Sequence, residues 1–394
     1  MRDTEFERET VCCVKMATTS SWIASRAPGL AAAAMTAAAA AGIAGSLPEA
    51  WHISAIPVSI VLGAAAGNAA PASVTATLKP GLQFASSSVL RAGIVCVGAK
   101  LSAAQVLGLG WMTVPAAAAS VGAGVIAIPA LAAAAGLSPR LGALLASGTS
   151  ICGVTAISAV APVVAATQAE VAIAVANVVA YGSAGMLLYP HLAHVLFPEG
   201  DSRSVGLFLG LAVHDTSQVM GTAASYAEQY NDADVVAAAA VAKLTRNVFL
   251  AGVVPLMAVR HAAAAASAST APFSLAAAVP SFVGGFLAFA AVRSLGDHQL
   301  ASGSSALGIF DVSSWRAGAD WIGSTLGTKL LLGSGLAAVG LSVRLSAFRG
   351  VGAAPFAVGA AGAGLVGGVG LGAALLGASM RDHQHQKVKT IKAS

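Results

Sequence analysis

Between Lys100 and Arg140 the sequence reads LSAAQVLGLGWMTVPAAAASVGAGVIAIPALAAAAGLSP, without one Asp, Glu, Lys or Arg. An ionised side chain at the centre of a bilayer costs ~2.5 to 3.5 kcal/mol or more, so spanning helices contain few of them. A spanning helix needs ~20 apolar residues, and this run is longer than that. The stretch therefore predicts a helix that crosses a membrane.

The rest of the chain repeats this pattern. Of its 394 residues, 57% are hydrophobic and 9% are charged, against about 25% charged in soluble proteins. Further charge-free runs lie between Arg26 and Glu49, Glu49 and Lys79, Arg140 and Glu170, Glu170 and Glu199, Arg260 and Arg293, and Arg349 and Arg381. Apolar segments with internal polar groups lie at 83–104, 205–227, 234–259 and 320–343. We therefore predict an all-α polytopic membrane protein with ten or eleven transmembrane helices.

The chain divides into a soluble N-terminal tail (1–27), a transmembrane transporter domain (28–379) and a basic C-terminal tail (380–394). Lys and Arg in the loops favour a cytoplasmic N-terminus, although the basic C-terminal tail then falls outside. The acid-free, Ser- and Ala-rich stretch 16–48 also resembles an organellar transit peptide, the alternative being a first span at 29–47. We expect an integral protein of the cell membrane, with an organellar membrane as the alternative.

Several protein classes lack support in the sequence. The formal charge of +5 sits largely in tails and loops, so no nucleic-acid partner is expected. The four cysteines have neither metal-ligand nor disulfide spacing, and we predict no metal and no cofactor. The chain contains no phosphate-binding loop, nucleophile elbow or His-Glu-x-x-His helix, so we do not expect an enzyme or direct ATP drive.

Two segments resemble each other. LRAGIVCVG at 90–98 and LGSGLAAVG at 332–340 both read Leu-x-x-Gly-x-x-x-Val-Gly, and each is followed by a basic residue and Leu-Ser-Ala. In the predicted order an odd number of crossings separates them, so they run in opposite directions. The pattern favours inverted repeats, which place a substrate site between the repeats; chance similarity of two Gly- and Ala-rich helices is the alternative.

A short polar segment, Gly148-Thr-Ser-Ile-Cys-Gly153, interrupts one charge-free run. Two glycines and two hydroxyl residues weaken a continuous helix there. If the helix breaks, free N–H groups, the positive helix end and the hydroxyls of Thr149 and Ser150 form an anion site. We predict substrate binding by Gly148, Thr149, Ser150 and Gly153, the alternative being a glycine packing notch in an intact helix.

Ionisable residues inside apolar segments supply the other candidates. His214 and Asp215 head a polar cluster that ends at Gln218, and intramembrane ionisable groups usually have a function. We assign proton coupling to His214 and Asp215, because His titrates near neutral pH, and substrate binding to Gln218; a loop-edge cluster is the alternative. Lys243 and Arg246 share one helical face, where they could bind an oxyanion inside the bundle or extend to an interface.

At these residues the chain resembles the YeiH family of bacterial inner-membrane proteins, which are described as sulfate exporters. The resemblance runs from about 28 to 377 and rests on several motifs: 63–68, Pro80-Gly-Leu, Leu90-Arg-Ala-Gly-Ile, 148–153, 213–219, Lys243-Leu-Thr-Arg246, Pro280-Ser-Phe and 337–341. It implies a secondary transporter with the inverted-repeat architecture of bile-acid-symporter-like carriers. Asp215 stands where the family usually has Glu, and Arg293 where it has Asn.

The leading hypothesis is therefore a secondary transporter that exports sulfate or a related small inorganic anion across the lipid bilayer. A cation/proton antiporter that uses Asp215 and a structural or regulatory membrane protein without a transported substrate are the alternatives. A homo-oligomer is compatible with the sequence.

Overall fold

The computed structural model describes residues 3–48, 54–100, 103–197, 201–261, 281–344 and 352–393. Within these ranges the chain is helical and its only β pairing is an isolated bridge between Ala306 and Phe310. Seven described helices are long and apolar enough to cross a membrane: Ser21–Ser46, Ala72–Lys100, Thr113–Ala134, Gln168–Leu196, Asp234–Arg260, Val312–Ser342 and Ala353–Arg381. The prediction of an all-α polytopic membrane protein is confirmed.

The chain forms two compact units. Unit 1 comprises Met1–Ile94 and Ser324–Arg344, and unit 2 comprises Val95–Gly323 and Leu345–Ser394. The helices α1 (Asp3–Ser46), α2 (Ala55–Ala69), α3 (Ala72–Phe84), η2 (Ala85–Val89) and α17 (Gly333–Ser342) belong to unit 1. Helices α4 (Leu90–Val97) and η4 (Trp321–Leu332) pass from one unit to the other.

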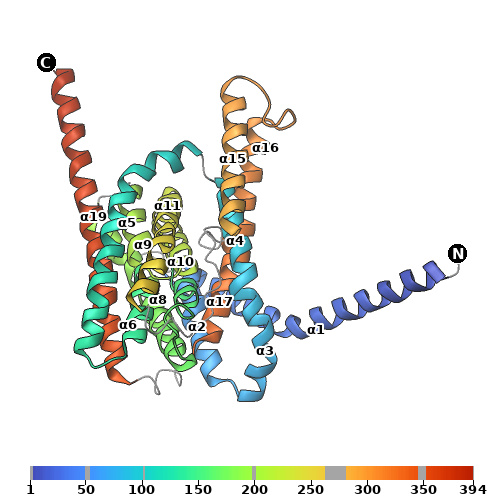
Figure 1. The fold of residues 1–394 in the computed structure, drawn as a ribbon. Helices are drawn as coiled ribbons and strands as arrows, with labels where there is room; N and C mark the ends of the chain where they lie inside the picture. The colour runs from blue at the N-terminus through green and yellow to red at the C-terminus, as the bar shows by residue number, and fades with distance from the viewer. Residues whose placement is uncertain are drawn as a thin grey trace. The chain divides into compact units, whose positions relative to one another are not determined.

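Unit 2 contains the remaining helices, most of which are labelled in Figure 1. They are η3 (Gly98–Lys100), α5 (Ala103–Ala134), α6 (Pro139–Ser150), α7 (Val154–Val160), α8 (Gln168–Leu196), α9 (Ser202–Ala212), α10 (Thr216–Gln229), α11 (Asp234–Val248), α12 (Leu250–Arg260), α15 (Ser281–Ala301), α16 (Val312–Asp320) and α19 (Ala353–Ala393). Helices α5, α6 and α19 run side by side.

Local sequence signals explain where two of these helices begin. At α6 the Ser138 hydroxyl accepts a hydrogen bond from the Leu141 N–H, and Pro139 occupies the first turn, where its missing N–H is not needed. At α8 Thr167 and Glu170 form a reciprocal capping box. These caps satisfy N–H groups that a helix start otherwise leaves without acceptors.

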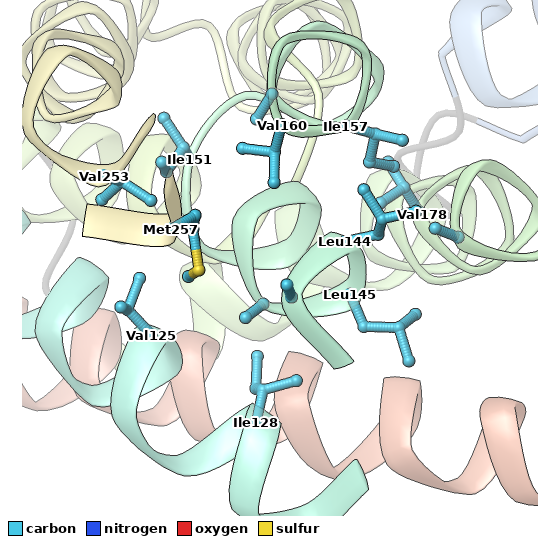
Figure 2. Packing of buried hydrophobic residues seen from close by; sticks show 14 of the residues in the cluster. Val125, Ile128, Leu144, Leu145, Ile151, Ile157, Val160, Val178, Val253 and Met257 are labelled. Atoms are coloured by element: carbon cyan, nitrogen blue, oxygen red, sulfur yellow. The ribbon is translucent and has the colours of Figure 1, made fainter. Parts of the chain in front are cut away.

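The core of unit 2 surrounds α6 and α7. Figure 2 shows Leu144 and Leu145 of α6 and Ile157 of α7 among apolar side chains from neighbouring helices. Ile151, which lies between α6 and α7, is completely buried in the same cluster. The cluster therefore holds in place the short segment that separates the two helices.

The parts of the two repeat segments that belong to unit 1 pack against each other. A Cβ atom on Gly335 would lie 2.6 Å from Cβ of Leu90, and one on Gly93 would lie 2.9 Å from the backbone N of Leu332. Residue numbers rise along one segment as they fall along the other, so the two run antiparallel, as expected. The Leu-Ser-Ala parts of the repeat fall partly outside the described residues, and the inverted repeat stays a prediction.

Three segments of the chain differ from the sequence-based predictions, refine them or lie outside the described residues. As turn-forming residues, Pro71 and Pro80 predict a loop between them, but Pro71 precedes α3 and Pro80 lies inside this helix. The polar and apolar mixture between Arg293 and Asp320 predicts a short interfacial helix in this connection, and the structure has the short helix α16 there. The apolar segment 306–310 itself forms a turn with positive φ at Leu307 and Gly308. Of the predicted span between Arg260 and Arg293, residues 262–280 lie outside the described residues.

Candidate functional site

Two of the predicted spans are discontinuous. Helix α6 ends at Ser150 and α7 begins at Val154, and Gly153 between them has φ +69° and ψ −125°. A side chain at such a position is strained, so the break depends on glycine. Helix α9 likewise ends at Ala212, and α10 begins at Thr216. The predicted break at 148–153 is confirmed, and the alternative of an intact helix is wrong.

The two breaks lie next to each other in unit 2. A Cβ atom on Gly153 would lie 3.0 Å from both Cβ and Oδ2 of Asp215. The Lys243 ammonium binds both breaks, since its Nζ lies 2.8 Å from the Ile151 carbonyl oxygen and 3.1 Å from that of Val213. We call residues 151–153 and 213–215 together the helix crossing.

Lys243 and Arg246 of α11 are both completely buried. The side-chain nitrogens of Lys243 and Arg246 donate to the carbonyl oxygens of Thr149, Ile151, Leu211, Val213 and His214, which we call the carbonyl cluster. These carbonyl groups lie in the last turns of α6 and α9 or directly after them, where carbonyls lack helical partners and the helix dipole is negative. Buried cations are therefore stabilised there. Arg91 and Lys329, by contrast, are exposed.

Asp215 occupies the opposite kind of helix end. Its carboxylate accepts a hydrogen bond from the Ser217 N–H at 2.9 Å, and Gln218 Oε1 accepts one from the Asp215 N–H at 3.3 Å. A carboxylate at the positive N-terminus of α10 is stabilised by the dipole and by the cap. The helix crossing thus contains one carboxylate and binds two cations, each at the helix end of opposite polarity.

A family model described as "Conserved hypothetical protein 698" matches residues 28–359. The chain belongs to this family. A UPF0324 membrane protein of Ralstonia nicotianae is 33% identical over 228 residues, covering 56% of this chain and 60% of the relative. The UPF0324 inner membrane protein YeiH of Escherichia coli is 29% identical over 238 residues, 59% of this chain and 66% of that protein. No solved structure matches.

These relatives confirm the resemblance to the YeiH family and identify the chain as an integral membrane protein. The aligned region spans 60% of the length of the Ralstonia relative. The names of these relatives state membrane location and no substrate.

Thr149 and Ser150, the two hydroxyl residues predicted to bind substrate, lie at the negative C-terminal end of α6. The Thr149 carbonyl accepts from Arg246 at 3.4 Å. The Ser150 hydroxyl has no hydrogen-bond partner among the described residues and lies against Gly124 of α5, where a Cβ atom would collide with it. The positive end is instead the start of α7, where Val154 and Thr155 are exposed.

The remaining predicted site residues, His214 and Gln218, are buried, and so is Asn247, which was not predicted. The His214 ring is buried, and neither of its nitrogens has a partner among the described residues. Gln218 donates to the Val179 carbonyl of α8 at 3.4 Å. Asn247, which was not predicted, is buried beside Arg246 and donates to the Thr216 hydroxyl at 3.3 Å. Its only sequence signal is a position next to Arg246.

Proposed function

We propose that this chain is a secondary transporter that exports a small inorganic anion, such as sulfate, through unit 2. The observation that supports this function is the helix crossing, where two broken membrane helices meet beside two buried cations. Discontinuous helices of this kind form the substrate sites of many secondary transporters. Two cations against one carboxylate leave the described crossing with an excess positive charge, which favours an anion.

A dianion that leaves water loses a large hydration energy, which fixed donors and a retained positive charge must replace. The first backbone N–H groups of α7 have no helical acceptors, and exposure of Val154 and Thr155 leaves the first turn accessible. We propose that the anion binds on this accessible side of the helix crossing, where the two buried cations outweigh the single Asp215 carboxylate. In this conformation the N–H groups of Lys243 and Arg246 are bound to the carbonyl cluster. These two residues therefore act on the anion through their positive charge.

Proton coupling is assigned to His214 and Asp215. A buried imidazole without hydrogen-bond partners among the described residues is a group whose protonation changes the charge of the crossing. Asp215, the neighbouring carboxylate, would stabilise the imidazolium. Gln218 links this pair to α8, which gives it a positioning role in the proposed mechanism.

The experiment is flux of labelled sulfate, sulfite and chloride into liposomes that contain the purified protein, with and without a pH gradient. Empty liposomes and an Arg260→Gln variant serve as controls, because Arg260 lies on the same apolar segment but outside the crossing. We expect flux of at least one anion. Sodium or proton flux without any anion flux would instead identify a cation/proton antiporter, and no flux at all would favour a structural or regulatory protein.

A further inference from the structure

The carbonyl cluster has the chemistry of a cation site. Its members are buried backbone oxygens from the ends of two half-helices. Backbone carbonyl oxygens replace the hydration shell of monovalent cations in membrane proteins, and the ends of broken helices coordinate sodium in secondary transporters. In this chain the oxygens already have cationic partners.

The Lys243 ammonium lies where a bound ion would lie. Its Nζ donates to Ile151 at 2.8 Å, to Val213 at 3.1 Å and also to His214. An ammonium is a compact charge with three donors, so three carbonyl oxygens satisfy it completely. Among the described residues Lys243 forms no ion pair with a carboxylate. Its charge is therefore stabilised by the dipoles of the three carbonyl groups.

We infer that Lys243 is a tethered cation that fills a site for a small monovalent cation, so the helix crossing needs no free sodium or potassium ion. Arg246 has a different role, because its planar guanidinium extends to Leu211 and Thr149, which Lys243 does not contact. The inference about the site stands on the contacts alone. Its consequence for transport, that anion flux is independent of sodium, rests on the proposed function.

Removal of the ammonium should expose the site. In Lys243→Met the three oxygens keep only the bonds from Arg246, which lie at 2.8 Å for Ile151, 3.2 Å for Val213 and 3.3 Å for His214. The position of Nζ then becomes available to an ion. Because a ligand that binds only the folded state raises its stability by mass action, a small cation should stabilise the variant and leave the wild type unchanged.

The test is thermal unfolding of the purified full chain in detergent, in choline, sodium, potassium or methylammonium chloride at equal ionic strength. We expect one wild-type midpoint in all four salts. Lys243→Met should unfold at a lower temperature in choline, and at least one smaller cation should raise its midpoint by several degrees with saturation. Lys243→Gln, which keeps an amide donor, provides the same comparison if Lys243→Met does not fold.

Arg260→Met is the matched control, since it removes a cation from the same apolar segment outside the carbonyl cluster; its midpoint should not respond to the choice of cation. A Lys243 variant whose midpoint no small cation raises would overturn the inference. So would a wild-type midpoint that sodium raises above its value in choline. If the wild-type protein carries no anion in liposomes, the proposed function is refuted. The inference about the cation site is then decided by the unfolding midpoints alone.

Discussion

Replacing Arg246 with Gln removes a buried cation whose nitrogens donate to every member of the carbonyl cluster. Lys243 still binds three of these oxygens, whereas those of Leu211 and Thr149 lose the side-chain donor. A buried acceptor without a donor costs about 1–3 kcal/mol, which gives about 2–6 kcal/mol for two. Loss of the charge at the helix ends adds up to ~2 kcal/mol, and relief from burying that charge offsets part of the total.

We therefore expect Arg246→Gln to lower the free energy of unfolding by about 2–5 kcal/mol. The measurement is equilibrium unfolding by dodecyl sulfate in mixed micelles, followed by circular dichroism. Arg260→Gln is the control and should remain within about 0.5 kcal/mol of the wild type, as surface changes usually do. From sequence alone, this substitution is expected to reduce transport and leave the fold intact; the observed contacts predict a loss of stability as well.

An Arg246→Gln variant as stable as the wild type would refute this reasoning. It would mean that water, Lys243 or the introduced amide satisfies the carbonyls of Leu211 and Thr149 at no cost. Anion flux in liposomes should fall together with stability. Normal flux in the variant would remove Arg246 from the proposed transport site.

Three further outcomes are expected. Gly153→Ala should destabilise the protein by about 1–3 kcal/mol, because its φ of +69° strains any side chain and Cβ would approach Asp215; an unchanged unfolding curve in dodecyl sulfate would contradict this. His214→Gln should flatten the pH dependence of anion flux, and a wild-type pH profile would exclude His214 from coupling. Hydrogen bonds from the Ser313 and Ser314 side chains, then from the Ser314 N–H, lower the pKa of Asp311 to about 2. The cap of α16 should thus stay intact above the ordinary pKa of 3.8 and be lost as pH falls through about 2. Hydrogen-exchange protection of α16 should therefore decrease only as the pH falls below 3.8 towards about 2. In Asp311→Ala this protection should be low at every pH.

The sequence by itself determined that this is an all-α membrane protein. Charge-free runs such as 101–139 are sufficient for that conclusion, since the cost of an ionised group in hydrocarbon depends on local composition and not on the partners of the helix. The first helix break was also predictable, because Gly148 and Gly153 flank hydroxyl residues within one apolar run. The second break has no Gly or Pro at 211–218, and was missed. The spacing of Asp215 and Gln218 is a capping-box pattern, however, and it marks the start of α10.

Only the tertiary structure decided what Lys243 and Arg246 do. Their spacing placed them on one helical face, yet the same spacing suits a pair that extends to the membrane surface. Their partners are the backbone oxygens of the carbonyl cluster, at 149, 151, 211, 213 and 214, far away in sequence. Backbone carbonyls are present at every residue, so no side-chain pattern can reveal which of them become unpaired at a helix end and collect around a cation. That depends on where two helices break and on how α6, α9 and α11 pack together.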